Sequence, residues 1–88
     1  MVRRHVIVTG AVQGVWFRDT CQGLARRAGV AGWIRNRPDG SVEAVFEGDD
    51  DAVDKLVAWC HEGPERARVD AVEVTAQPVE GSAGFWVR

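Results

Sequence analysis

The spacing of apolar residues in the first third of the chain predicts a strand followed by a helix. Residues 5–12 are rich in Val, Ile and Thr, which favours a strand that ends at Gly14. From Phe17 onward the apolar residues recur at the three- and four-residue steps of one helix face. Gly29 is placed to end this helix, because glycine adopts the left-handed conformation that often follows a helix. The apolar positions of the helix face are Phe17, Cys21, Leu24, Ala25 and Ala28.

The middle of the chain predicts a hairpin and then a second helix. Residues 30–36 form a second strand, and the Pro-Asp-Gly sequence at 38–40 is a turn signal. Residues 42–46 alternate between apolar and polar, as a half-buried strand paired with the second one would. The aspartates at 49–51 can cap the next helix and favour its positive end, and Gly-Pro at 63–64 ends it. The apolar face of this helix is Val53, Leu56, Val57 and Cys60.

The remaining apolar segments predict a fourth strand at 69–76 and a short last strand at 85–87. The order strand, helix, strand, strand, helix, strand is the ferredoxin-like βαββαβ arrangement, of α+β class. We expect a four- to five-stranded antiparallel sheet with both helices on one face. Right-handed crossovers make the first and second strands parallel, with the third between them. Residues 1–88 are expected to form a single domain, since the chain has no internal repeat or linker.

Composition narrows the function classes without choosing one. The chain has 45% hydrophobic and 27% charged residues, as an ordinary globular protein does. Eleven basic residues against thirteen acidic ones give a net charge of −2, which argues against a nucleic-acid-binding module. No apolar run is long enough to cross a membrane, and the N-terminus lacks a signal-peptide core. Two cysteines and no metal-binding motif leave a cytoplasmic protein as the expectation.

The segment from Gly10 to Arg18 carries the first candidate chemistry. A glycine-containing loop leaves a strand and enters a helix, with Arg18 in the first helical turn. Unpaired backbone N–H groups and the helix dipole attract oxyanions at such a place. An arginine adds a planar fork suited to phosphate or carboxylate. The segment therefore predicts an anion-binding loop, although an arginine at a helix start is also commonly just a solvated charge.

Asn36 carries the second candidate chemistry. It lies at the carboxyl end of the second strand, and asparagine is disfavoured within strands. Because the first two strands are parallel, we expect Asn36 and the Arg18 loop at the same end of the sheet. The alternative is that Asn36 merely helps to form the turn at 38–40.

Together these two segments resemble the acylphosphatase family. That family is marked by Gly-x-Val-Gln-Gly-Val-x-Phe-Arg followed by Gly-Trp-Val-x-Asn-x-x-Asp-Gly. The chain has both, at 10–18 and 32–40, with Trp16 at a variable position and Ile34 where Val is usual. The spacing, the length and the element order also agree, so the resemblance covers the whole chain. Cys21 departs from the family, since many members carry threonine there.

The resemblance implies hydrolysis of the mixed anhydride of a carboxylic acid and phosphate, which gives a carboxylate and inorganic phosphate. It implies no metal and no cofactor. Arg18 and Asn36 would be catalytic, with Asn36 orienting the attacking water. The absence of a His–carboxylate pair near either motif is consistent with this, because an acyl phosphate already has a good leaving group and its loose transition state needs mainly positioning. The phosphate-binding residues would be Gln13, Gly14, Val15, Trp16, Phe17 and Arg18.

Several other residues with reactive or charged side chains are expected to have structural or surface roles and not catalytic ones. His5 and His61 are isolated in the sequence and are expected at the surface or at a strand edge. The aspartates at 49–51 mark a helix start before they mark a metal site. Arg35 and Arg37 are expected to be solvated on the strand face away from the asparagine, where they would attract anionic substrate.

The cysteines and tryptophans leave alternatives open. Cys21 and Cys60 are predicted at neighbouring ends of two antiparallel helices, so they are either close enough to bridge or two buried reduced thiols. Trp16 flanks the anion-binding loop, and the sequence leaves open whether its side chain forms a wall of the site. The tryptophans assigned to packing are Trp33, Trp59 and Trp86.

Three other functions remain open at this stage. The first is a binding module of the same fold for RNA or a small regulatory ligand, although Glu43 and Glu47 on the third strand disfavour RNA. The second is a phosphate-binding domain of a larger assembly, as in carbamoyl-transferring hydrogenase maturation proteins. The third is a phosphate sensor without turnover. The expectation is a monomer that takes a small acyl phosphate and binds neither nucleic acid nor membrane.

Overall fold

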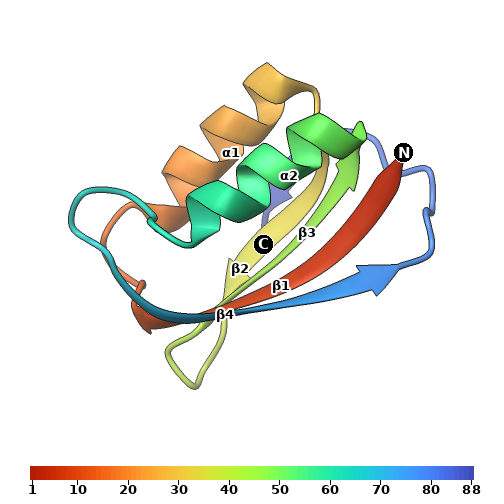
Figure 1. Cartoon of the computed structure of the whole chain (residues 1–88). Coiled ribbons are helices and arrows are strands. Elements are labelled where there is room, and N and C mark those ends of the chain that lie inside the picture. Colours follow the sequence, from red (N-terminus) through yellow and green to blue (C-terminus); the bar gives the residue numbers. More distant parts are fainter.

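The computed structural model describes residues 1–88, and all the predicted strands and helices are present in the predicted order (Figure 1). The sheet has five strands in the order β4-β1-β3-β2-β5. No helix is long and apolar enough to cross a membrane. In chain order the elements are β1 (Val2–Ala11), α1 (Phe17–Ala28), β2 (Ala31–Asn36), β3 (Val42–Gly48), α2 (Asp50–Cys60), β4 (Arg68–Gln77) and β5 (Phe85–Val87).

The centre of the sheet has the predicted topology. β3 is antiparallel to both β1 and β2, so β1 and β2 run parallel to each other on either side of it. The Pro-Asp-Gly turn between β2 and β3 is closed by two backbone bonds, Arg37 N to Ser41 O at 2.9 Å and Gly40 N to Arg37 O at 3.1 Å. The Asp39 carboxylate also accepts the Ser41 N–H at 2.9 Å, as an aspartate in a turn is expected to do.

The last strand corrects the expectation of an antiparallel sheet, because β5 pairs with β2 in the parallel direction and the sheet is mixed. The reason lies in residues 78–84. β4 ends beside Arg3, at the end of the sheet where β2 begins, and the connection stays at that end. The buried Glu47 carboxylate holds it there by accepting the N–H groups of Glu80 at 2.8 Å and Ser82 at 2.7 Å. β5 therefore starts where β2 starts and runs with it.

Both helices cover one face of the sheet (Figure 1), and the core lies between them and the strands. The helices are antiparallel, because the Phe17 ring at the start of α1 lies 4.9 Å from the Trp59 ring near the end of α2. Burial of the apolar stripes of both helices against the sheet supplies the main stabilisation. Fully buried side chains from all layers include Val6, Val8, Phe17, Cys21, Ala25, Ile34, Phe46, Val53, Cys60 and Phe85.

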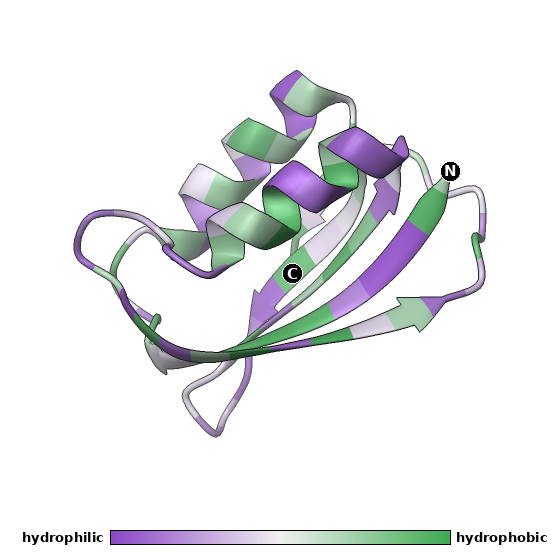
Figure 2. Ribbon diagram, in the orientation of Figure 1, coloured by the Kyte–Doolittle hydropathy of each residue, from purple (hydrophilic) through white to green (hydrophobic).

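β1 begins three residues earlier than the apolar pattern predicts. After Val2, β1 has a hydrophilic stretch followed by a hydrophobic one, as Figure 2 shows. The charged Arg3 nevertheless lies in the sheet, because its guanidinium pairs with the buried Glu47 carboxylate at 3.2 Å. Arg3 Nε also donates to Gln77 Oε1 at 3.0 Å. A buried charge of this kind requires a partner from another strand, and that partner is not visible in the local pattern.

The expected aspartate cap on α2 is absent. Asp49 occupies the N-cap position, but its exposed carboxylate makes no bond to the first turn. The backbone carbonyl of Asp49 accepts the Val53 N–H at 2.9 Å instead. Asp50 and Asp51 still stand in the first turn, where a negative charge is favourable to the helix dipole.

Cys21 and Cys60 are both buried as free thiols, so no disulfide joins the two helices. Burial raises the pKa of the Cys60 thiol to about 12 and that of Cys21 still further. The second of the two readings, a pair of buried reduced thiols, is the one that the structure has.

Candidate active site

The loop between β1 and α1 enters the helix through two residues in the left-handed conformation. Gly14 has φ 74° and Trp16 has φ 68°. Glycine adopts this conformation freely, whereas for another residue it costs roughly 1–2 kcal/mol. Trp16 is the N-cap of α1, and its side chain makes no bond to the first turn. The helix thus begins without the Ser, Thr, Asp or Asn that usually covers its first N–H groups.

This loop presents a continuous series of free hydrogen-bond donors. The first helical bond runs from Thr20 N to Trp16 O at 3.1 Å. The backbone N–H groups of residues 14–19 have no acceptor within the protein. Free N–H groups at a helix start, together with the positive end of the helix dipole, form a site for an oxyanion.

Arg18 and Asp19 place charged side chains beside these donors. Arg18 is half-buried in the first turn of α1 and makes no hydrogen bond or ion pair with the protein. Its guanidinium is therefore free to pair with an anion. Asp19 is exposed and acidic in the first turn, where the dipole favours it. Nothing in the sequence pattern distinguished Asp19 from an ordinary residue at a helix start.

Asn36 is the last residue of β2, where it pairs with Val42 of β3. Its neighbour Ile34 points into the core and Arg35 points to the helix-free side of the sheet, so Asn36 faces the helices. Asn36 Oδ1 is buried and has no hydrogen-bond partner, and no other buried side-chain nitrogen or oxygen atom lacks one. The turn that follows is closed by other residues, so the reading of Asn36 as a turn-forming residue is not supported.

These residues line one cavity of about 200 Å³. Arg18 and Asn36 are 18 residues apart in the sequence, and the parallel arrangement of β1 and β2 brings them together as predicted. Gln13 and Val15 belong to the same loop but do not line the cavity. The lining residues are Val12, Gly14, Trp16, Phe17, Arg18, Asp19 and Asn36.

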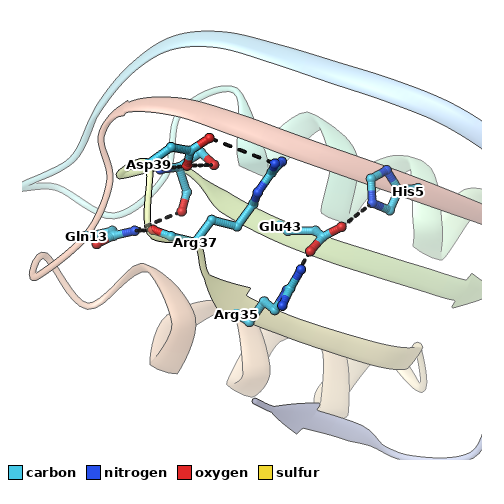
Figure 3. Close-up of polar contacts among 7 residues, drawn as sticks. His5, Gln13, Arg35, Arg37, Asp39 and Glu43 are labelled. Atoms are coloured by element: carbon cyan, nitrogen blue, oxygen red, sulfur yellow. Dashed lines mark hydrogen bonds and ion pairs between the residues drawn. The ribbon is translucent and has the colours of Figure 1, made fainter.

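Gln13 connects the loop to the turn after Asn36. Its side-chain amide donates to the backbone carbonyls of Arg37 at 2.7 Å and Ser41 at 2.9 Å (Figure 3). The first of these bonds joins the anion-binding loop to the residue that directly follows Asn36, and the second joins it to the far side of the same turn. The family resemblance implied Gln13 as a phosphate-binding residue, and the role of its side chain could not be found without knowing which turn lies opposite.

A second polar cluster lies on the helix-free side of the sheet. Glu43 of β3 accepts bonds from His5 Nε2 of β1 and Arg35 Nε of β2, both at 2.6 Å (Figure 3). Burial opposes ionisation of Glu43, but the bonds from His5 and Arg35 outweigh it and hold the pKa of the carboxyl below its ordinary value. The register of the three central strands brings these residues together, so His5 is not the isolated edge residue that the sequence suggested.

The tryptophans differ from one another in role. Trp59 packs on Phe17 and against the core, so it is a packing residue as predicted. Trp33 is half-buried and lies beneath the Arg88 guanidinium at 4.6 Å. Trp86 is 57% exposed, which corrects its assignment to packing. No group of three or more His, Cys, Asp or Glu side chains is arranged to hold a metal ion.

Comparison with known proteins places the chain in a family. The family model described as Acylphosphatase matches residues 4–87. An acylphosphatase of Rubrobacter xylanophilus is 61% identical over 98% of this chain and 79% of its own length. One of Haloarcula marismortui is 55% identical over 98% of this chain and 94% of its own. The crystal structure of acylphosphatase from Bacillus subtilis superposes with a TM-score of 0.95, at 36% identity, over 100% of this chain and 99% of that one. The chain belongs to the acylphosphatase family of enzymes.

Proposed function

We propose that the loop entering α1 holds the phosphoryl group of an acyl phosphate while Asn36 orients the water molecule that attacks it. Membership of the family makes the chain an enzyme that hydrolyses acyl phosphates. The observation that carries the assignment of residues is the unpartnered Asn36 Oδ1. It is buried at the wall of a cavity whose other walls offer free N–H groups and the free Arg18 guanidinium.

The donors suit the charge that develops during phosphoryl transfer. The transition state is loose, with negative charge spread over three equatorial oxygens. The N–H groups of residues 14–19 and the Arg18 fork can bind those oxygens without rearrangement, because no protein acceptor competes for them. Fixed donors of this kind stabilise the transition state more than mobile water would.

Asn36 suits the attacking water. Its Oδ1 accepts a hydrogen bond from water but cannot take up a proton, so its role is orientation and not general base catalysis. The cavity contains no His, and its titratable side chains are Arg18 and Asp19. A strong base is not required, because the departing carboxylate is a good leaving group. The phosphate oxygens and the water would thus all be held by backbone and side-chain groups of a single chain, and we propose that the enzyme acts as a monomer.

Hydrolysis of benzoyl phosphate in the presence of a chelator tests these roles. Arg18→Ala should lose both phosphate binding and turnover, each by about a hundredfold or more. Asn36→Ala should lose turnover to a similar extent, about a hundredfold, while still binding inorganic phosphate. Arg27→Ala is the matched control, since Arg27 lies in the last turn of α1, away from the cavity, and should retain wild-type kinetics.

Three outcomes would contradict the proposal. Near-normal turnover by Asn36→Ala would exclude the water-orienting role. Phosphate binding that depends on Arg18 without any turnover by the wild-type protein would favour the phosphate sensor. Loss of wild-type activity on adding the chelator would exclude a metal-independent reaction.

A further inference from the structure

Trp16 is exposed in a way that neither packing nor folding explains. Its side chain is 68% exposed at the wall of the cavity. The chain has four tryptophans, and the other three each contact an aromatic ring or a guanidinium. Trp16 has no such partner. Its backbone is also the only non-glycine one with positive φ. A large apolar side chain is therefore exposed to solvent at a position with strained backbone, where glycine or asparagine would be better tolerated.

The reaction geometry decides which wall of the cavity faces the acyl group. In phosphoryl transfer the attacking and leaving oxygens lie roughly in line on opposite sides of phosphorus. Because the water is held at the buried Asn36 Oδ1, the acyl group must leave on the other side and extend toward solvent. It then passes the exposed wall of the cavity, which belongs to the loop before α1.

Trp16 is the one residue of that wall with an apolar side chain available for contact. Val12 and Phe17 also line the cavity, but their side chains are buried in the core at 1% and 2% exposure. Gly14 has no side chain, and Arg18 and Asp19 are charged. An indole at this position presents a flat apolar face, which favours a planar or extended apolar group in offset stacking.

We propose that Trp16 forms the acyl subsite and gives the enzyme a preference for acyl phosphates with an aromatic or extended apolar acyl group over those with a small one such as acetyl. The inference rests on the proposed function, because it assumes that the phosphoryl group sits in the cavity and the water on Asn36. Trp16 is a specificity residue and touches only the leaving half of the substrate. Its backbone N–H, in contrast, belongs to the phosphate-binding loop.

The ratio of kcat/KM for benzoyl phosphate to kcat/KM for acetyl phosphate tests the subsite. Trp16→Gly keeps the positive φ and should lower this ratio by roughly tenfold, the size of one aromatic stacking interaction with its buried area. Trp16→Phe retains an aromatic face and should keep most of the preference. Trp86→Ala removes another exposed tryptophan outside the cavity and should leave the ratio as in the wild type.

Three results separate the possible failures. A ratio that stays unchanged in Trp16→Gly would overturn the subsite while leaving the proposed function standing. Equal losses with both substrates, accompanied by weaker inhibition by inorganic phosphate, would mean that the loop itself is damaged and would also overturn it. If the wild-type protein hydrolyses neither substrate, the proposed function fails first, and the subsite with it.

Discussion

Gln13 offers a test of whether the two halves of the site must be joined. Its amide donates two hydrogen bonds, to Arg37 O at 2.7 Å and to Ser41 O at 2.9 Å. Gln13→Met keeps the length of the side chain and removes both donors. At about 1 kcal/mol for each bond, the variant should lose about 2 kcal/mol and unfold roughly 8–16 °C lower, given the small size of the chain. Thermal unfolding followed by circular dichroism measures this loss.

The kinetic consequence should be larger than the loss of stability suggests. Arg37 directly follows Asn36, so loosening the turn moves the proposed water site relative to the phosphate-binding loop. A displacement of about 1 Å at a reacting centre can cost up to about a hundredfold in rate. We expect kcat for benzoyl phosphate to fall by about ten- to a hundredfold in Gln13→Met, while the inhibition constant of inorganic phosphate changes much less. The split arises because phosphate contacts the loop and the water contacts Asn36.

Two further variants make the test specific. Gln22→Met removes one longer bond, to Phe85 O at 3.3 Å, outside the cavity, and should keep wild-type kcat. Gln13→Glu places a carboxylate against two carbonyl oxygens, which raises its folded pKa, so this variant should become less stable relative to wild type as pH rises above about 4.3. If Gln13→Met unfolds at the wild-type temperature and keeps wild-type kcat, the connection has no functional importance and our reasoning is wrong.

Three other predictions follow from the packing. Hydrogen bonds from the Glu80 N–H, the Ser82 N–H and Arg3 lower the pKa of Glu47, although burial opposes them. Wild-type stability, measured by urea unfolding, should therefore fall as pH drops below about 4.3 toward that lowered pKa. Glu47→Gln should be less stable at pH 7 and lack that part of the fall, and equal pH profiles would exclude Glu47 as the cause. The Cys21 and Cys60 thiols should resist a thiol reagent at pH 8 in the folded protein and both react in denaturant, whereas a count of zero would reveal a disulfide. Gly32→Ala should prevent stable folding, because its Cβ would lie 1.8 Å from Val45 O, while Gly40→Ala, also at positive φ but in open space, should fold with a modest loss of melting temperature.

The elements and their order could be predicted from the sequence, because they depend on local periodicity and on turn and helix-end residues. The three- and four-residue apolar steps from Phe17, the glycine at 29 and the Pro-Asp-Gly turn at 38–40 all act within a few residues, and each predicted what the structure has. The parallel direction of β1 and β2 also followed, since it depends only on the handedness of one crossover. That was enough to bring Arg18 and Asn36 to one end of the sheet.

The contacts between distant segments could not be predicted from the sequence and are known only from the folded structure. The parallel β5 depends on Glu47 holding residues 78–84 at one end of the sheet, and the early start of β1 depends on Arg3 finding that same carboxylate. The bonds from Gln13 to the turn and the unpartnered oxygen of Asn36 are of the same kind. Each is a polar group whose energy depends on a partner, or on the lack of one, dozens of residues away. Such groups carry no periodicity, so a sequence pattern indicates where they are but not what they face.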